Sequence, residues 1–164
     1  MRRTLPGLFR QAENSPLAGA PVVPPAADVP GATVRCAHGA RPTTRSSHGS
    51  VDHIIGSDGT QIPVTANVVL ASGGTVHFAG WIANGSAAAT SACLVIDGKV
   101  ATTSGVYGLD RPDVAAAYNA PAMERTGYAI ATKLPHGTHR VAVAALEADG
   151  SIDQMAPELT VTAR

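Results

Sequence analysis

Aromatic residues, cysteines and long apolar runs are all scarce in this chain of 164 residues. Phe, Trp and Tyr make up 4% of the residues, so a core must be built from Val, Ile, Leu and Ala, which fit the pleated surface of a sheet. No stretch approaches the roughly 18 apolar residues of a membrane span, and we expect no transmembrane segment. A dense basic stripe with interleaved aromatics is also missing, which argues against nucleic acid as a partner.

Only two cysteines, Cys36 and Cys93, are present, so at most one disulfide can form. Cys93 falls in a strongly apolar segment, where a free thiol is commonly buried. We therefore expect a buried thiol at Cys93 and a separate thiol at Cys36. No Cys/His spacing resembles a zinc site, and we expect no metal and no cofactor.

The first 50 residues differ in composition from the rest of the chain. They hold seven of the twelve prolines and six Arg against two acids, whereas residues 51–164 hold six Lys or Arg against ten acids. Such a segment buries too little apolar surface to offset about 1–2 kcal/mol of backbone ordering per residue. We predict a disordered arm over residues 1–50 and one domain over 51–164. Arg2 and Arg3 are not followed by an apolar segment of about 7–15 residues, so no signal peptide is evident.

From residue 51 the chain alternates apolar and polar residues between turn signals, the pattern of β-strands. Asp97-Gly98 is a strong signal for a tight hairpin. About seven or eight short strands are expected, and a two-sheet antiparallel sandwich buries the apolar faces of that many strands economically. One short helix is expected from Asp110 to Tyr118, with Asp110 as its cap and Pro112 in its first turn. The expected inward residues include Val76, Phe78 and Ile82, then Val141, Val143 and Ala145, then Leu159, Val161 and Ala163.

Several short motifs lie between about residues 75 and 145: Gly80-Trp81, Val95–Gly98, Tyr107–Val114, Gly127-Tyr128 and Leu134–Val141. Together they resemble a family of bacterial β-sandwich modules found in uncharacterised and cell-envelope-associated proteins. The resemblance implies an immunoglobulin-like accessory or adhesion-type fold and a location at the cell envelope or outside the cell. It implies no known reaction.

Four residues are candidates for ligand binding: His77, Trp81, Arg111 and His139. His77 and Trp81 lie four apart in one strand, on the face opposite Phe78, where an exposed indole could stack on a sugar or hold a peptide. The competing interpretation is that Trp81 covers the second face of the sheet. Arg111 is expected to brace a neighbouring loop through hydrogen bonds to carboxylate or carbonyl oxygens. His139 lies beside a turn, and its main interpretation is a surface residue.

No nucleophile elbow, reactive-cysteine signature or phosphate loop occurs in the sequence. We therefore expect a monomeric, non-catalytic binding or interaction module that contacts a protein or a carbohydrate. Two alternatives remain open. One is a small hydrolase with a loop site near His139 and Arg111, and the other is a structural fragment of a larger assembly.

Overall fold

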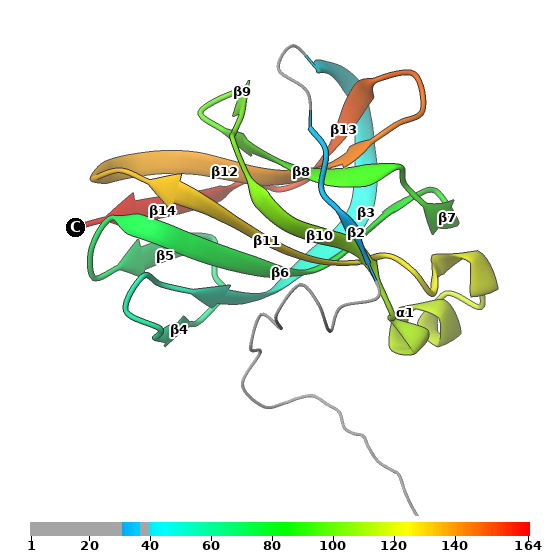
Figure 1. Cartoon of the computed structure of the whole chain (residues 1–164), viewed down its shortest axis with the longest axis horizontal. Coiled ribbons are helices and arrows are strands. Elements are labelled where there is room, and N and C mark those ends of the chain that lie inside the picture. The colour runs from blue at the N-terminus through cyan, green and yellow to red at the C-terminus, as the bar shows by residue number, and fades with distance from the viewer. Residues whose placement is uncertain (1–30, 37–39) are drawn as a thin grey trace, which may run out of the picture.

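The computed structural model describes residues 31–36 and 40–164, and almost every element in them is a strand (Figure 1). A six-residue helix and one 3₁₀ turn interrupt the strands. In chain order the elements are β2 (Ala32–Thr33), β3 (Arg41–Ile55), β4 (Gln61–Ile62), β5 (Asn67–Leu70), β6 (Gly74–Asn84), β7 (Ala87–Ala88), β8 (Ser91–Ile96), β9 (Lys99–Val100), β10 (Ser104–Leu109), α1 (Pro112–Ala117), η3 (Pro121–Met123), β11 (Gly127–Leu134), β12 (Gly137–Leu146), β13 (Ser151–Met155) and β14 (Leu159–Ala163).

These strands form one curled, mixed sheet rather than the two-sheet sandwich expected from the sequence. Its main path runs β2-β10-β11-β6-β3-β13-β12-β14-β5, with β4, β7, β8 and β9 attached beside it. All pairs are antiparallel except β3 with β13 and β5 with β14. The prediction of a two-sheet, wholly antiparallel sandwich is therefore wrong for the described residues.

Strand β3 is the reason that the sheet is continuous. Its 15 residues are long enough to belong to both halves of the sheet: residues 48–55 pair with β6, and residues 41–47 pair with β13 on the other side. Figure 1 shows β3 in cyan passing between the β6–β11 half and the β12–β13 half. A strand that crosses between two packed halves turns one sheet into a partial barrel around a single core.

The core inside this curl is aliphatic, as the composition requires. Phe78, Ile82 and Ile130 from one half meet Leu94 and the β12 and β14 residues from the other. The predicted inward residues are confirmed: Leu159 is partly buried against this core, and its members include Val76, Val141, Val143, Ala145, Val161 and Ala163. Asp97 and Gly98 both have positive φ, at 51° and 80°, so the predicted tight hairpin is confirmed between β8 and β9.

A second, smaller cluster forms where α1 and η3 cover the outer face of β6. Val114 and Met123 pack there on Trp81 and Ala83. The predicted helix is confirmed, but its cap is not. The N-cap residue is Arg111 and makes no side-chain cap, whereas the Asp110 carboxylate accepts a hydrogen bond of 2.6 Å from Arg125.

Part of the predicted N-terminal arm is integral to the sheet. β3 runs unbroken across the expected boundary between residues 50 and 51, and Val34 is buried in the main core. The prediction of disorder is therefore wrong for residues 31–36 and 40–50. These polar residues gain their order from backbone pairing with β13 and β10, which their own composition does not reveal. The remainder of the arm, residues 1–30 and 37–39, lies outside the described residues.

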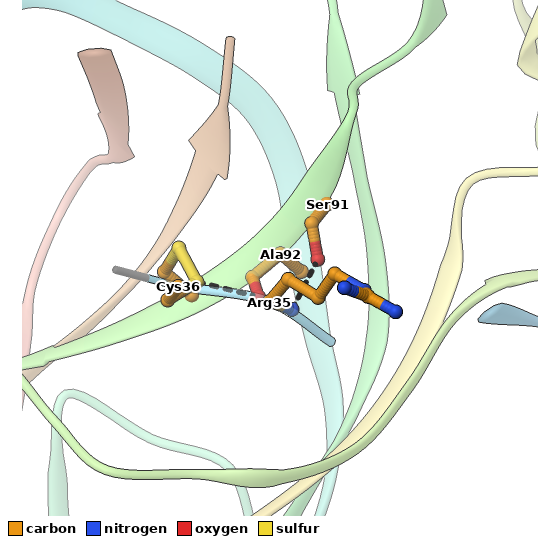
Figure 2. Close-up of a disulfide and its surroundings, with 5 residues drawn as sticks. Arg35, Cys36, Ser91 and Ala92 are labelled. Atoms are coloured by element: carbon orange, nitrogen blue, oxygen red, sulfur yellow. Dashed lines mark hydrogen bonds between the residues drawn. A yellow bond between two sulfur atoms is a disulfide. The ribbon is translucent and has the colours of Figure 1, made fainter. Parts of the chain in front are cut away.

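The two cysteines form a disulfide, contrary to the expectation of separate thiols (Figure 2). The bond joins the segment after β2 to β8. Beside it the Arg35 amide donates to Ser91 Oγ at 3.1 Å, and the Cys36 sulfur lies 3.2 Å from the Ala92 carbonyl oxygen. Cys93 is fully buried, and it lies in a cluster with Val95, Ala144 and Ile152 on the outer face of β8 and β12.

Candidate functional site

An apolar cavity of about 170 Å³ opens in the sheet where β13 leaves β3, and we call it the notch. β13 pairs with β3 as far as Met155 opposite Ser47. The chain then turns through Ala156 and Pro157, and Pro157 has no N–H with which to continue the ladder. In the described part of the chain no strand pairs with this side of β3 until β4 reaches Ile54. A length of β3 edge therefore faces the notch without a strand partner.

The walls of the notch come from five strands and two loops. They are almost entirely aliphatic or aromatic, with Ser50 as the polar side chain. A cavity of about 150 Å³ lined by such residues accepts a benzene-sized molecule, so the notch has room for one apolar side chain. Its lining residues are Gly49, Ser50, Val51, Val64, Phe78, Val141, Ala142, Val143, Met155, Ala156, Pro157 and Leu159.

Close packing of β3 on β6 fixes this edge. A Cβ atom on Gly80 would lie 2.0 Å from the Ser50 carbonyl oxygen and 2.8 Å from the Tyr128 hydroxyl. Because Gly80 has no side chain, Tyr128 on β11 reaches across β6 and donates to that carbonyl at 3.0 Å. Burial raises the pKa of Tyr128 well above its ordinary value, so the phenol stays protonated and remains a donor.

A β-bulge sets the direction of the next carboxylate. Val51 pairs with Gly80 and His53 with Ala79, so Asp52 is the extra residue in β3. Its carboxylate accepts from Ser50 Oγ at 2.7 Å and from Arg111 Nη1 at 2.9 Å. The bulge thus ties the notch edge to the start of α1.

Arg111 donates hydrogen bonds to two carboxylates, those of Asp52 and Asp113. Besides Asp52, it donates from Nε and Nη2 to both oxygens of Asp113, at 2.9 and 2.7 Å. The hydrogen bond from Arg111 lowers the pKa of Asp113. The sequence-based interpretation of Arg111 as a brace agrees with this geometry, because its hydrogen bonds connect β3 to the helix.

Trp81 and His77 do lie on the face of β6 opposite Phe78, but they form no exposed aromatic platform. Trp81 is only 8% exposed and meets the edge of the Tyr118 ring, with the ring centroids 5.4 Å apart. Tyr118 is the exposed member of the pair. His77 is half-buried between β3 and β11, and its buried Nδ1 atom has no hydrogen-bond partner among the residues that the structure describes. The interpretation that Trp81 covers the second face of the sheet fits its position.

His139 forms a separate polar group at the start of β12. Its Nδ1 lies 2.8 Å from an Asp97 carboxylate oxygen, and its Nε2 lies 3.0 Å from the Pro135 carbonyl oxygen. Both neighbours are acceptors, which favours the doubly protonated ring. The hydrogen bond to Asp97 raises the pKa of His139 accordingly.

The structure does not bring His139 and Arg111 together. The start of β12 pairs with the C-terminal strand, and Figure 1 places the C-terminus at the opposite end of the long axis from α1. The four candidate residues therefore occupy three different places, and none of them lines the notch. Within the described residues no group of three His, Cys, Asp or Glu could hold a metal ion.

Sequence reasoning missed the notch because its walls are ordinary core residues. The signals that mark it are subtler: Gly49 and Gly80, where a Cβ would meet backbone at 2.6 and 2.0 Å, and Pro157 just after a strand. In the described part of the chain no helix is long and apolar enough to cross a membrane. Comparison with protein-family models and with curated proteins gives no match for this chain.

Proposed function

We propose that this domain is a non-catalytic binding module that holds an extended protein segment against the unpaired edge of β3, with one apolar side chain in the notch. The observation that carries the proposal is the coincidence of an apolar cavity of about 170 Å³ with a strand edge that lacks a partner strand. An added strand gains affinity from backbone hydrogen bonds and specificity from a side-chain pocket.

The choice of a peptide over a glycan follows from the surroundings of the notch. A sugar site requires an exposed aromatic face and several polar groups, whereas Trp81 is covered and Ser50 is the one polar side chain of the lining. Ser50 already donates to Asp52. Hydrogen bonding to a ligand is therefore left mainly to the backbone of β3, which suits an extended peptide.

The direct test is a titration followed by backbone amide chemical shifts. The probe is a blocked pentapeptide, Thr-Val-Leu-Val-Thr, compared with the same peptide carrying Asp at the central position. We expect the leucine peptide to shift the amides of residues 49–53, 155, 156, 158 and 159 and the aspartate peptide to shift none of them. Shifts confined to another face, or equal shifts with both peptides, would overturn the proposal.

A cavity-filling variant provides the matched control. Val64 is partly buried and lines the notch, so Val64→Phe should occupy the cavity and weaken leucine-peptide binding at least tenfold. Val69→Phe adds the same ring at a position that is 46% exposed on β5, outside the notch, and should bind as the parent does. Equal affinity in Val64→Phe and the parent would place the peptide elsewhere.

A further inference from the structure

Two buried carboxyl groups face each other at the end of the curl beyond the core. Glu147 is 9% exposed and Asp153 is 5% exposed. Asp153 pairs with Ala145 across the β12–β13 hairpin, and the Glu147 amide donates to the Ser151 carbonyl at 2.8 Å. Glu147 and Asp153 are therefore diagonal neighbours on the inner face of the sheet, within reach of a side-chain hydrogen bond.

The hydrogen bonding of Glu147 is incomplete unless a proton lies between the two groups. Its Oε1 atom accepts from Asn84 Nδ2 at the end of β6. Its Oε2 atom is buried and has no partner among the described residues. An unpaired, ionised oxygen beside a second carboxylate would be costly in such a place, whereas a carboxylic acid can donate to its neighbour.

Asp153 is in turn the main side-chain link between β13 and the first half of β3. It accepts from Thr43 Oγ1 and from Arg45 Nε, the latter at 3.3 Å, and its backbone oxygen accepts from Ser47 Oγ at 2.8 Å. β13 ends two residues later at Met155, which lines the notch. Whatever disturbs Asp153 therefore disturbs the parallel β3–β13 pairing that closes the curled sheet.

We propose that Glu147 and Asp153 share one proton and that this proton acts as a pH-sensitive latch on the β3–β13 pairing. While the proton is present, the pair is a neutral acid bound to a carboxylate. When it passes to water, two like charges remain in a confined space, and the displacement of Asp153 from Glu147 disturbs its hydrogen bonds to Thr43 and Arg45 on β3. The latch concerns the closure of the sheet and does not depend on peptide binding at the notch.

The charges that surround the pair favour the shared proton. Burial is the largest cause of the raised pKa of Glu147, and the charge of Asp153 is the next largest. Asp149 adds to this effect, while Arg45 opposes it from a side chain that is 64% exposed and so is screened by solvent. Tyr107 also faces Glu147, but burial raises its pKa to about 12, and it stays neutral throughout the working range.

The direction of the effect follows from linkage. An acid whose pKa is higher in the folded chain holds its proton there after the unfolded chain has lost it. The contribution of the latch is therefore complete below the ordinary pKa of Glu147, near 4.5, and is lost as pH rises through the raised value. The sheet closure should loosen toward alkaline pH.

Amide hydrogen exchange tests this on the full chain. We expect protection factors, corrected for intrinsic rates, to fall about tenfold between pH 5 and pH 8.5 for the paired residues Ser46, Ser47, Gln154 and Met155. In Glu147→Gln the side-chain amide can donate to Asp153 at every pH while its oxygen accepts from Asn84, so these protection factors should not change with pH. Glu158→Gln removes a carboxylate outside the pair and should behave as the parent.

Two results would overturn the proposal. One is an equal pH-dependent loss of protection in the parent and in Glu147→Gln. The other, which needs no variant, is a carboxyl ¹³C titration of Glu147 in the parent with a midpoint at or below the ordinary value. If Glu147→Gln fails to fold, this second measurement still decides the matter.

Discussion

Breaking the Cys36–Cys93 bond should cost much of the stability of this domain. The bond closes a loop with a sequence separation of 57 residues. In the loop-entropy model a crosslink of this span stabilises the fold by about 4 kcal/mol, chiefly by restricting the unfolded chain. Against a typical total of about 5–15 kcal/mol, that is a large fraction. The melting temperature should fall by about 10 °C, since 1 kcal/mol corresponds to roughly 2–4 °C at this size.

The assay is urea denaturation of the full chain with and without a reducing agent. The midpoint should fall on reduction, and the slope should rise because the uncrosslinked unfolded chain exposes more surface. Cys36→Ala should match the reduced parent and should not respond to the reducing agent, which controls for effects of the reagent itself. An unchanged midpoint in the reduced parent would refute the reasoning and restore the original expectation of two independent thiols.

Three further outcomes follow from the contacts. Val143→Asp should unfold the domain or nearly so, because it places a carboxylate in the fully buried core. Arg140→Ala should lower the free energy of unfolding by less than about 1 kcal/mol, since the Arg140 side chain is 72% exposed, and chemical denaturation compares the two variants. Gly80→Ala should lower the free energy of unfolding by about 1–3 kcal/mol or more, because a Cβ there would lie 2.0 Å from a backbone oxygen. A smaller decrease, measured by thermal unfolding, would contradict this close approach. His139→Gln should remove a contribution that is present below about pH 6.5 and is lost as pH rises through the raised pKa of His139, so the denaturation midpoints of parent and variant should converge at alkaline pH.

Period-two patterning predicted the inward residues because burial on one face of a strand is a local property. Val141, Val143 and Ala145 alternate in the sequence and point into one core in the structure. The Asp97-Gly98 hairpin was predictable for a similar reason, since two adjacent positive φ values require that kind of dipeptide. Neither feature depends on which strands lie side by side.

No pattern in the sequence indicates which distant strands pair with each other. Residues 41–47 are polar and carry Pro42, so their composition indicates disorder, yet they pair with β13 more than 100 residues away in the sequence. The disulfide is hidden in the same way, because it joins two segments that meet only once β2 and β8 are in place. Composition reports what a segment can bury by itself and is silent on what a neighbouring strand supplies.

The same limit explains why the candidate residues and the notch do not coincide. Trp81, Arg111 and His139 attract notice as residue types that often bind ligands, but each is already satisfied by a neighbour: Trp81 by a ring and the two others by acceptors. The notch exists because β13 stops while β3 continues, which is a mismatch in strand lengths rather than a motif. A mismatch of this kind leaves backbone donors and acceptors unpaired beside apolar walls. In our proposal it is that combination, rather than any conspicuous side chain, that holds another strand.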